Sequence, residues 1–219
     1  MRAALLMAII FGLSSAALAQ DSVLDRRIKA DAPGAAVVWL PDSITNGMFA
    51  WRISASAGVP MIFEASPLDY RDPAIAAQRF DLLGLNVREA LDFLVAQDPR
   101  YRWEERDGIV IIRPIGLLAD PGDALNQRIA GARGDRVRLE DVLARVTAAV
   151  WRTGVPPLTP AAAAIDSQEF ALDTPGGTVL DLLAAAARAH GGVMWSAGFS
   201  IGFNTFAGAG AVVAGDAAR

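Results

Sequence analysis

Two segments that lie 92 positions apart share one pattern of apolar and polar residues. The first runs from Asn86 to Ile112 and the second from Thr178 to Ile201. In each, apolar residues follow the i, i+3, i+4, i+7, i+8 spacing of one helix face: Val87, Ala90, Leu91, Leu94 and Val95, then Val179, Leu182, Leu183, Ala186 and Ala187. A tryptophan, a glycine-bearing turn and a β-rich run follow each stripe. The pattern predicts a helix, a strand, a turn and a strand, in that order, twice.

Both predicted helices have the sequence of a capped N-terminus. Asn86 and Thr178 precede the apolar stripes, and an acid follows each of them by three residues, Glu89 and Asp181. Such an acid can accept a hydrogen bond from the N–H of the cap residue, and it lies at the positive end of the helix dipole. We therefore expect the helices to begin at these positions.

Some of the other predicted elements also recur in the same order. In the first half they are a strand at Ala35–Leu40, a helix at Met48–Ala57 that stops at Gly58-Val59-Pro60, a short strand at Met61–Phe63 and an alternating run at Phe80 and Leu82. In the second half they are a helix after Arg138, a stop at Gly154-Val155-Pro156 and an alternating run at Phe170 and Leu172. Gly and Pro stop a helix, and alternation predicts a strand with one buried face.

These elements predict an α+β fold of two tandem small modules, each with amphipathic helices packed on a short mixed or antiparallel β-sheet. The turn sequence Asp120-Pro121-Gly122-Asp123 marks the boundary between them. The predicted division is a signal peptide at 1–19, a flexible lead-in at 20–33, a module at 34–115, a linker at 116–126, a second, divergent module at 127–204 and a Gly/Ala-rich tail at 205–219.

The first 19 residues have the layout of a secretory signal peptide. Arg2 precedes an apolar stretch from Ala3 to Leu13, and Ala17-Leu18-Ala19 forms a small-x-small cleavage site. A membrane anchor is the alternative, but the stretch has about half of the ~20 residues that a spanning helix needs. We expect cleavage before Gln20, a periplasmic location, and no stable membrane span after cleavage.

Composition narrows the classes of function. The chain has no Cys and a formal net charge of −4 at pH 7, and 53% of its residues are hydrophobic. This indicates a globular protein that is stabilised by burial, without disulfides, in an oxidising compartment. An acidic balance without a basic stripe argues against nucleic acid as a partner.

The region from Met48 to Pro114 resembles a known family. Its helix, GVP-type stop, short strand and alternating strand, the run Asn-Val-Arg-Glu-Ala-Leu-Asp-Phe-Leu from Asn86, an aromatic strand and Gly108-Ile109-Val110-Ile111-Ile112 are similar to the secretin and TonB N-terminal short domain. The second half looks like a divergent copy. The resemblance implies a small α+β module of the Gram-negative periplasm that contacts other envelope proteins, as at the front of secretins and TonB-dependent receptors. Channel activity is not expected, because no run of alternating membrane strands follows the second copy.

Gly198-Phe199-Ser200-Ile201-Gly202 has the G-x-S-x-G spelling of a hydrolase nucleophile elbow. That motif needs a strand before the serine, a helix after it, and an acid and then a histidine later in the chain. The only histidine, His190, lies upstream at the expected end of a helix, where it suits the last carbonyls. We therefore interpret the motif as a strand, with Ser200 on the face opposite to Phe199. One histidine and no cysteine also give a transition metal too few ligands.

Two further groups of residues invite a functional interpretation. Glu104-Glu105-Arg106-Asp107 occupies a predicted hairpin tip, where solvated turn charge is expected rather than an acid–base pair, because general acids need burial or a close partner. Trp51 and Trp151 lie near the ends of corresponding helices, and Trp103 and Trp195 lie in corresponding strands. Core packing is expected for all four, but an exposed tryptophan is a candidate partner contact, with Trp51 and Trp151 the leading candidates.

The expected function is that of a non-enzymatic protein without a cofactor, which binds an envelope, secretion or signalling partner. Strand addition at an exposed sheet edge is the favoured mode, because short mixed sheets leave backbone groups unpaired. The alternative is a periplasmic small-ligand binding protein with a cleft between two lobes. A hydrolase that uses Ser200 is a third, less favoured interpretation.

Overall fold

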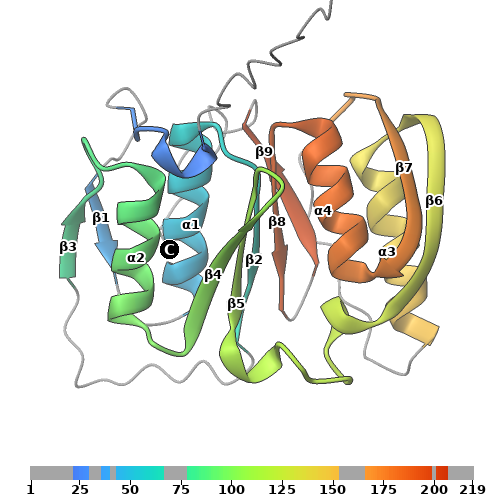
Figure 1. Cartoon of the computed structure of the whole chain (residues 1–219), viewed down its shortest axis with the longest axis horizontal. Coiled ribbons are helices and arrows are strands. Elements are labelled where there is room, and N and C mark those ends of the chain that lie inside the picture. Colours follow the sequence, from blue (N-terminus) through green and yellow to red (C-terminus); the bar gives the residue numbers. More distant parts are fainter. Residues whose placement is uncertain are drawn as a thin grey trace, which may run out of the picture.

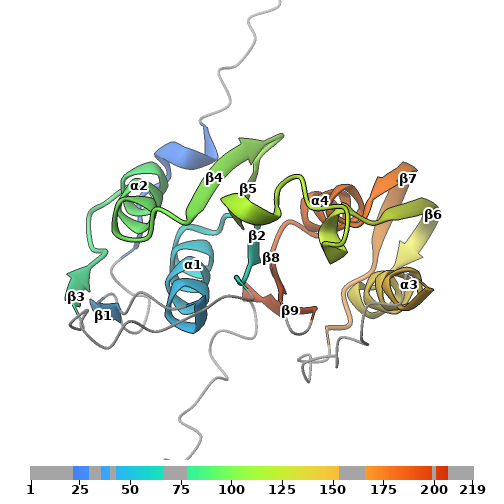
Figure 2. The same cartoon turned by 90° about the horizontal axis from the view of Figure 1, so that it is seen from below.

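One central β-sheet lies between two pairs of helices, and a two-stranded sheet covers the outer side of each pair (Figure 1). The computed structural model describes residues 22–29, 36–39, 43–66, 78–152, 166–198 and 201–206. Its helices and strands are, in chain order, η1 (Val23–Asp25), β1 (Ala36–Trp39), α1 (Ser43–Ala57), β2 (Met61–Glu64), β3 (Gln78–Asp81), α2 (Val87–Gln97), β4 (Tyr101–Arg106), β5 (Ile109–Pro114), η2 (Ile115–Leu117), η3 (Ala124–Asn126), β6 (Arg128–Val137), α3 (Leu139–Arg152), β7 (Phe170–Thr178), α4 (Val179–His190), β8 (Val193–Ala197) and β9 (Gly202–Thr205). The fold is α+β and has five layers, which Figure 2 shows from below.

The central sheet has the strand order β4-β5-β2-β8-β9 and combines strands from both halves of the chain. Its middle strand, β2, runs parallel to β5 on one side and to β8 on the other. The antiparallel hairpins β4–β5 and β8–β9 extend the sheet outward from β2. In this respect the structure differs from the prediction of a separate sheet for each module, because the two hairpins share one strand. The division of the chain into two modules stays a prediction.

Alternate side chains of the central strands enter two hydrophobic cores. Met61 and Phe63 pack with residues of α1 and α2, whereas Ile62 packs with residues of α3 and α4. In β5, Val110 and Ile112 belong to the first core, and Ile109 and Ile111 belong to the second. Strands that are apolar at every position are typical of sheets covered on both faces. The helices on both sides of the sheet therefore bury the apolar side chains that these strands carry on both faces.

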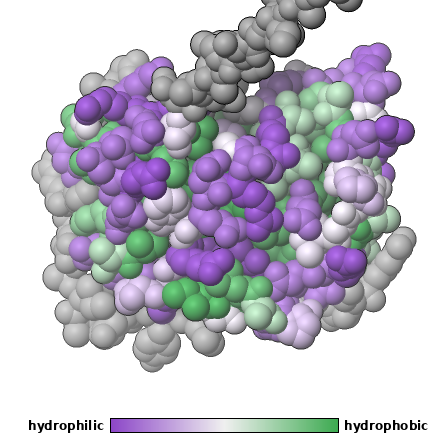
Figure 3. Space-filling model, viewed as in Figure 1, coloured by the Kyte–Doolittle hydropathy of each residue, from purple (hydrophilic) through white to green (hydrophobic). Residues whose placement is uncertain are grey.

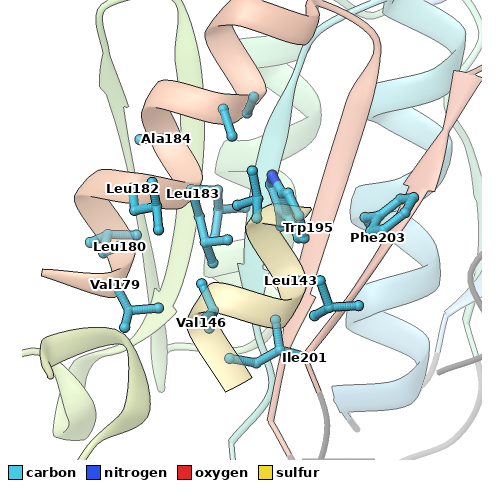
Figure 4. Packing of buried hydrophobic residues seen from close by; sticks show 14 of the residues in the cluster. Leu143, Val146, Val179, Leu180, Leu182, Leu183, Ala184, Trp195, Ile201 and Phe203 are labelled. Carbon is cyan, nitrogen blue, oxygen red and sulfur yellow. The ribbon is translucent and has the colours of Figure 1, made fainter. Parts of the chain in front are cut away.

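The helices α2 and α4 begin at the predicted caps. The side chains of Asn86 and Thr178 accept hydrogen bonds from the backbone N–H of Glu89 and Asp181, whose carboxylates accept from the N–H of the cap residues. The predicted apolar stripes face the cores, with Val87, Leu91, Val179 and Leu183 among the fully buried residues. Figure 4 shows the buried face of α4 against the central sheet. The capped amphipathic helices are thus confirmed.

The other predicted elements are present among the described residues, with one change of position and one additional strand. The motif from Gly198 to Gly202 does not form the predicted strand as a whole, because the strand there, β9, begins at Gly202, and Phe199 and Ser200 lie outside the described residues. The long strand β6 pairs with β7 and was not expected, because its sequence RIAGARGDRV contains two glycines and several charges, which are depleted in strands. One of these glycines has a packing role. An added Cβ at Gly131 would lie 2.5 Å from the carbonyl oxygen of Thr174, so the close approach of the two backbones requires glycine there.

Three segments predicted to lie outside the modules are packed in the structure. In the expected flexible lead-in, Leu24 and Ile28 are buried against α1 and α2. In the expected linker, Leu125 of η3 is fully buried in the other core. In the expected tail, Thr205 ends β9 and Phe206 contacts Trp51. Each of these segments is composed mainly of polar or small residues but contains an apolar side chain. Burial of that side chain against a hydrophobic core explains why the segment is packed.

Some predictions fall on residues that the structure does not describe. These are the signal peptide at 1–19, the helix stop at Gly154-Val155-Pro156, Ser200, and the tail from residue 207. Within the described residues, the helices are all too short or too polar to cross a membrane.

Replacement of either cap residue with alanine should lower the free energy of unfolding by about 1 kcal/mol, because a backbone N–H of the first helical turn loses its acceptor. Urea unfolding followed by circular dichroism measures the effect for Asn86→Ala and Thr178→Ala. The matched controls, Asn86→Asp and Thr178→Ser, keep an acceptor and should unfold close to wild type. Alanine variants as stable as these controls would contradict the role of the caps.

Candidate functional site

The most buried charged cluster lies at the carboxyl ends of the parallel strands β2 and β5. Arg113 donates from Nε to Glu64 Oε2 at 2.5 Å, from Nη2 to Asp123 Oδ1 at 2.9 Å and from Nη1 to Asn126 Oδ1 at 3.1 Å. Arg113 and Glu64 are only 4% and 3% exposed. The cluster fastens the segment around η3 to the end of the sheet. The turn sequence that marked a boundary thus supplies Asp123 to a buried network.

Two carboxyl groups surround the single guanidinium of this cluster. Burial raises the pKa of Glu64 to about 8, and its hydrogen bond with Asp123 acts in the same direction, against the opposing effect of Arg113. At neutral pH the cluster therefore holds a protonated Glu64 and an ion pair between Arg113 and Asp123. A raised pKa also occurs in general acids. Here the polar groups bind one another, so we interpret the cluster as a structural hydrogen-bond network that holds η3 against the sheet.

His190 forms a second polar contact, with Asp166. Its Nε2 lies 2.8 Å from Asp166 Oδ2, and the backbone N–H of Gly192 donates to Nδ1 at 3.2 Å. Because Nδ1 accepts, Nε2 carries the proton that Asp166 binds. A catalytic triad needs one ring nitrogen of the histidine to face the serine. Both nitrogens have other partners here, so the arrangement does not support a hydrolase, and Asp166 replaces the predicted helix carbonyls as the partner of the ring.

The seam between the two halves is filled. β2 and β8 are paired directly from Met61 opposite Met194 to Glu64 opposite Ala197, and apolar side chains pack on both faces of this pair. Two ion pairs also join the halves, Arg106 with Asp181 at 3.3 Å and Arg188 with Asp107 at 2.9 Å. The paired strands leave no room between them for a ligand, which argues against the alternative of a cleft at this seam.

Metal binding is not supported by the described part of the chain, in which no group of three or more His, Cys, Asp and Glu side chains could hold an ion. The charges at the tip of the β4–β5 hairpin are solvent-accessible, as the sequence predicts. Asp107, which is exposed, pairs with Arg188.

The corresponding tryptophans of the two hairpins differ in exposure. Trp195 is fully buried, with its ring 5.2 Å from that of Phe203 in a T-shaped contact, and Figure 4 shows it beside Leu183 of α4. Trp103 is only half-buried. The expected core packing therefore holds for Trp195 and only in part for Trp103. The reason is strand order: β8 is paired on both sides, and β4 is the edge strand of the sheet.

The two leading tryptophan candidates, Trp51 and Trp151, stay predictions. Trp51 is half-buried against the core, and the ring of Phe206 lies 6.2 Å from its own. The side chain of Trp151 lies outside the described residues. Trp103 joins them as a candidate contact, because it is half-buried on the edge strand of the central sheet.

Trp103 is held in place by α2. Its indole Nε1 donates to Asp92 Oδ1 at 3.1 Å, and the guanidinium carbon of Arg88 lies 5.9 Å from the ring centroid, within cation–π range. An aromatic side chain fixed at a sheet edge offers a partner a preformed contact at little entropic cost.

The backbone of β4 directs polar groups away from β5 at alternate residues. The hairpin turn has two residues, Asp107 and Gly108, with positive φ angles of 53° and 81°, as a type I′ turn requires. Arg106 and Ile109 therefore form the hydrogen-bonded pair that closes the hairpin, and such pairs alternate along an antiparallel ladder. Trp103 and Glu105 consequently direct their N–H and C=O groups away from β5.

On the face of β4 opposite to Trp103, the side chains carry alternating charge: Arg102, Glu104 and Arg106. Glu104 lies between the two arginines, 3.4 Å from Arg102 and 2.7 Å from Arg106. This edge faces the viewer in Figure 1, and Figure 3 shows a hydrophilic band over it in the middle of the molecule. Charge on an edge strand discourages indiscriminate pairing.

The other strand edges are shorter or interrupted. β1, β3 and β9 have four residues each. β6 contains a register shift between Gly134 and Val137, and β7 contains Pro175, which has no N–H to donate. β4 has six residues without a bulge or proline, and none of the described strands pairs with its outer side. We take this open edge, with Trp103, as the candidate functional site.

Comparisons of the chain with protein-family models, with curated proteins and with solved structures found no match. The geometry of the site therefore carries the functional argument.

The raised pKa of Glu64 has a consequence for stability. Folded protein keeps a proton on Glu64 that unfolded protein releases near the ordinary value of 4.5, so this contribution is complete below pH 4.5 and is lost as pH rises toward 8. Glu64→Gln imitates the protonated carboxyl but cannot lose a proton, so the pH-dependent contribution of Glu64 to stability should be absent in this variant. We expect the stability of wild type to fall relative to the variant by roughly 1 kcal/mol per pH unit between these values.

Urea unfolding of both proteins across the pH series measures this difference. Glu105→Gln changes an exposed carboxylate by the same chemistry and is the control for the loss of a surface charge. A constant difference between wild type and Glu64→Gln from pH 4.5 to pH 8 would show that the Glu64 carboxyl is ionised in the folded protein.

Proposed function

We propose that this protein is a non-enzymatic interaction module of the bacterial cell envelope that binds a partner protein by accepting a strand at the open edge of β4. The observation that carries the proposal is the uninterrupted edge itself, where Trp103 and Glu105 direct backbone groups outward. Main-chain hydrogen bonds to an added strand provide affinity, and the side chains around the edge provide selectivity.

The neighbouring side chains suit this role. On one face of the edge, Trp103 is anchored by Asp92 and lies beneath Arg88, so an incoming strand meets an aromatic surface of fixed geometry. On the other face, the alternating charges of Arg102, Glu104 and Arg106 favour a strand with opposite charges at matching positions. Because the edge is already ordered, only the partner strand loses conformational entropy on binding.

The cellular location in this proposal rests on the sequence. The pattern of the first 19 residues is that of an exported protein, and the resemblance to the secretin and TonB N-terminal short domain implies contacts with envelope proteins. The filled seam between the halves and the partnered ring of His190 favour this function over the ligand-binding and hydrolase alternatives.

A pair of substitutions at Glu105 tests strand addition. Glu105→Pro removes an outward N–H and leaves the hydrogen bonds between β4 and β5 in place, whereas Glu105→Ala keeps that N–H. Both variants lose the carboxylate that binds the N–H of Gly108, so they differ chiefly in the edge donor. In crosslinked co-purifications from envelope extracts, wild type and Glu105→Ala should recover the same partner, and Glu105→Pro should recover about tenfold less.

Thermal unfolding of both variants is the control for folding. Equal recovery of the partner by folded Glu105→Pro and Glu105→Ala would contradict strand addition at β4.

A further inference from the structure

We propose that the strand accepted by this edge is β4 of a second copy of the chain, paired antiparallel across a twofold axis at Trp103. The inference rests on the proposed function, because it names the occupant of the same open edge. Charged side chains and outward-facing backbone groups alternate along Tyr101–Arg106 in an order that fits this pairing.

The backbone is compatible with this axis. An antiparallel partner must place outward-facing residues opposite one another. An axis at Trp103 pairs Trp103 with its own copy and Glu105 with Tyr101 of the second copy, and each of these residues lies on the outward register of β4. The N–H of Tyr101 already donates to Asp98, so that pair is joined through the Tyr101 carbonyl and the Glu105 N–H. The result is a continuous sheet through both molecules.

The charges between Tyr101 and Glu105 are self-complementary in this register. Arg106 falls opposite Arg100 of the other copy, before the start of β4, where Arg100 is paired with Asp98 at 2.7 Å. An axis at Trp103 places Arg102 of each copy opposite Glu104 of the other, at the non-hydrogen-bonded positions where cross-strand side chains are closest. It also sets the two Trp103 side chains side by side. Opposite charges and aromatic pairs in such positions stabilise antiparallel strands, whereas like charges directly opposite destabilise them.

Two neighbouring registers are disfavoured by the same side chains. An axis at Glu104 would place the two Glu104 carboxylates opposite each other and Arg102 opposite Arg106 of the second copy. An axis at Glu105 would pair Glu104 with Arg106, but it would set Trp103 opposite the turn residue Asp107, outside β4. The alternating sequence therefore selects the axis at Trp103.

Charge exchange gives a specific test by analytical ultracentrifugation of the purified mature chain over a concentration series. Arg102→Glu places two glutamates opposite each other at both symmetric positions, and Glu104→Arg places two arginines there. Each single variant should dimerise at least about tenfold more weakly than wild type. The double variant R102E/E104R restores opposite charges and should dimerise again.

Mixing separates lost pairing from lost folding. An equimolar mixture of Arg102→Glu and Glu104→Arg pairs each glutamate with an arginine, so two weakly associating proteins should form a heterodimer. Glu105→Pro should remain monomeric in this assay and Glu105→Ala should dimerise.

Several outcomes would overturn the inference. A wild type that stays monomeric throughout the series would do so, as would single variants that dimerise like wild type, or a mixture that gives no heterodimer. Stronger dimerisation of Arg102→Glu would instead indicate the axis at Glu104. Such results leave the proposed function standing if wild type recovers a partner other than its own second copy in the co-purification and Glu105→Pro loses it. The two proposals can therefore fail independently.

Discussion

The pairing of β2 with two parallel neighbours is the constraint on which the rest of the structure depends. Because β5 lies on one side of β2 and β8 on the other, strands of both halves enter one sheet, and that sheet needs cover on both faces. The two helix pairs provide this cover, and the alternation of Met61, Ile62 and Phe63 divides the interior into two cores. The same pairing brings Glu64, at the end of β2, beside Arg113 of β5, which explains how a carboxyl group comes to be buried there.

The sequence predicts the local elements well and their long-range pairing poorly. The caps at Asn86 and Thr178 and the helical stripes depend on residues three to eight positions apart, so a pattern within one segment determines them. The turn at Asp107-Gly108 is equally local. The joining of β2 to β8 depends on segments more than a hundred residues apart, and no local pattern specifies it. One signal was present: Ile109–Ile112 has no polar position, which a sheet with a solvated face would have.

In the candidate site, too, local features can be predicted from the sequence and long-range features cannot. Tryptophan type and spacing identify Trp103 as one of several possible contacts, but its exposure depends on β4 being an edge strand, which only the strand order reveals. The buried network could not be found from the sequence for a related reason. Asp123 lies in a sequence typical of turns, and its role comes from the approach of Arg113 through tertiary structure. Strand β6 was missed because pairing with β7 and cover over the helices outweigh its weak intrinsic preference for extended structure.

The open edge follows from the sharing of β2. A strand has two sides, so two hairpins can join one strand only from opposite sides, and here both do so through a strand that runs parallel to it. The first hairpin uses its second strand, β5, and leaves its first strand, β4, at the edge; the second hairpin uses its first strand, β8, and leaves β9 there. Corresponding residues of the two hairpins therefore occupy different environments, and Trp195 is buried where Trp103 is accessible. Two segments with the same sequence pattern thus place one tryptophan in the core and one at a sheet edge, because β8 is paired on both sides, whereas β4 pairs only with β5 among the described strands.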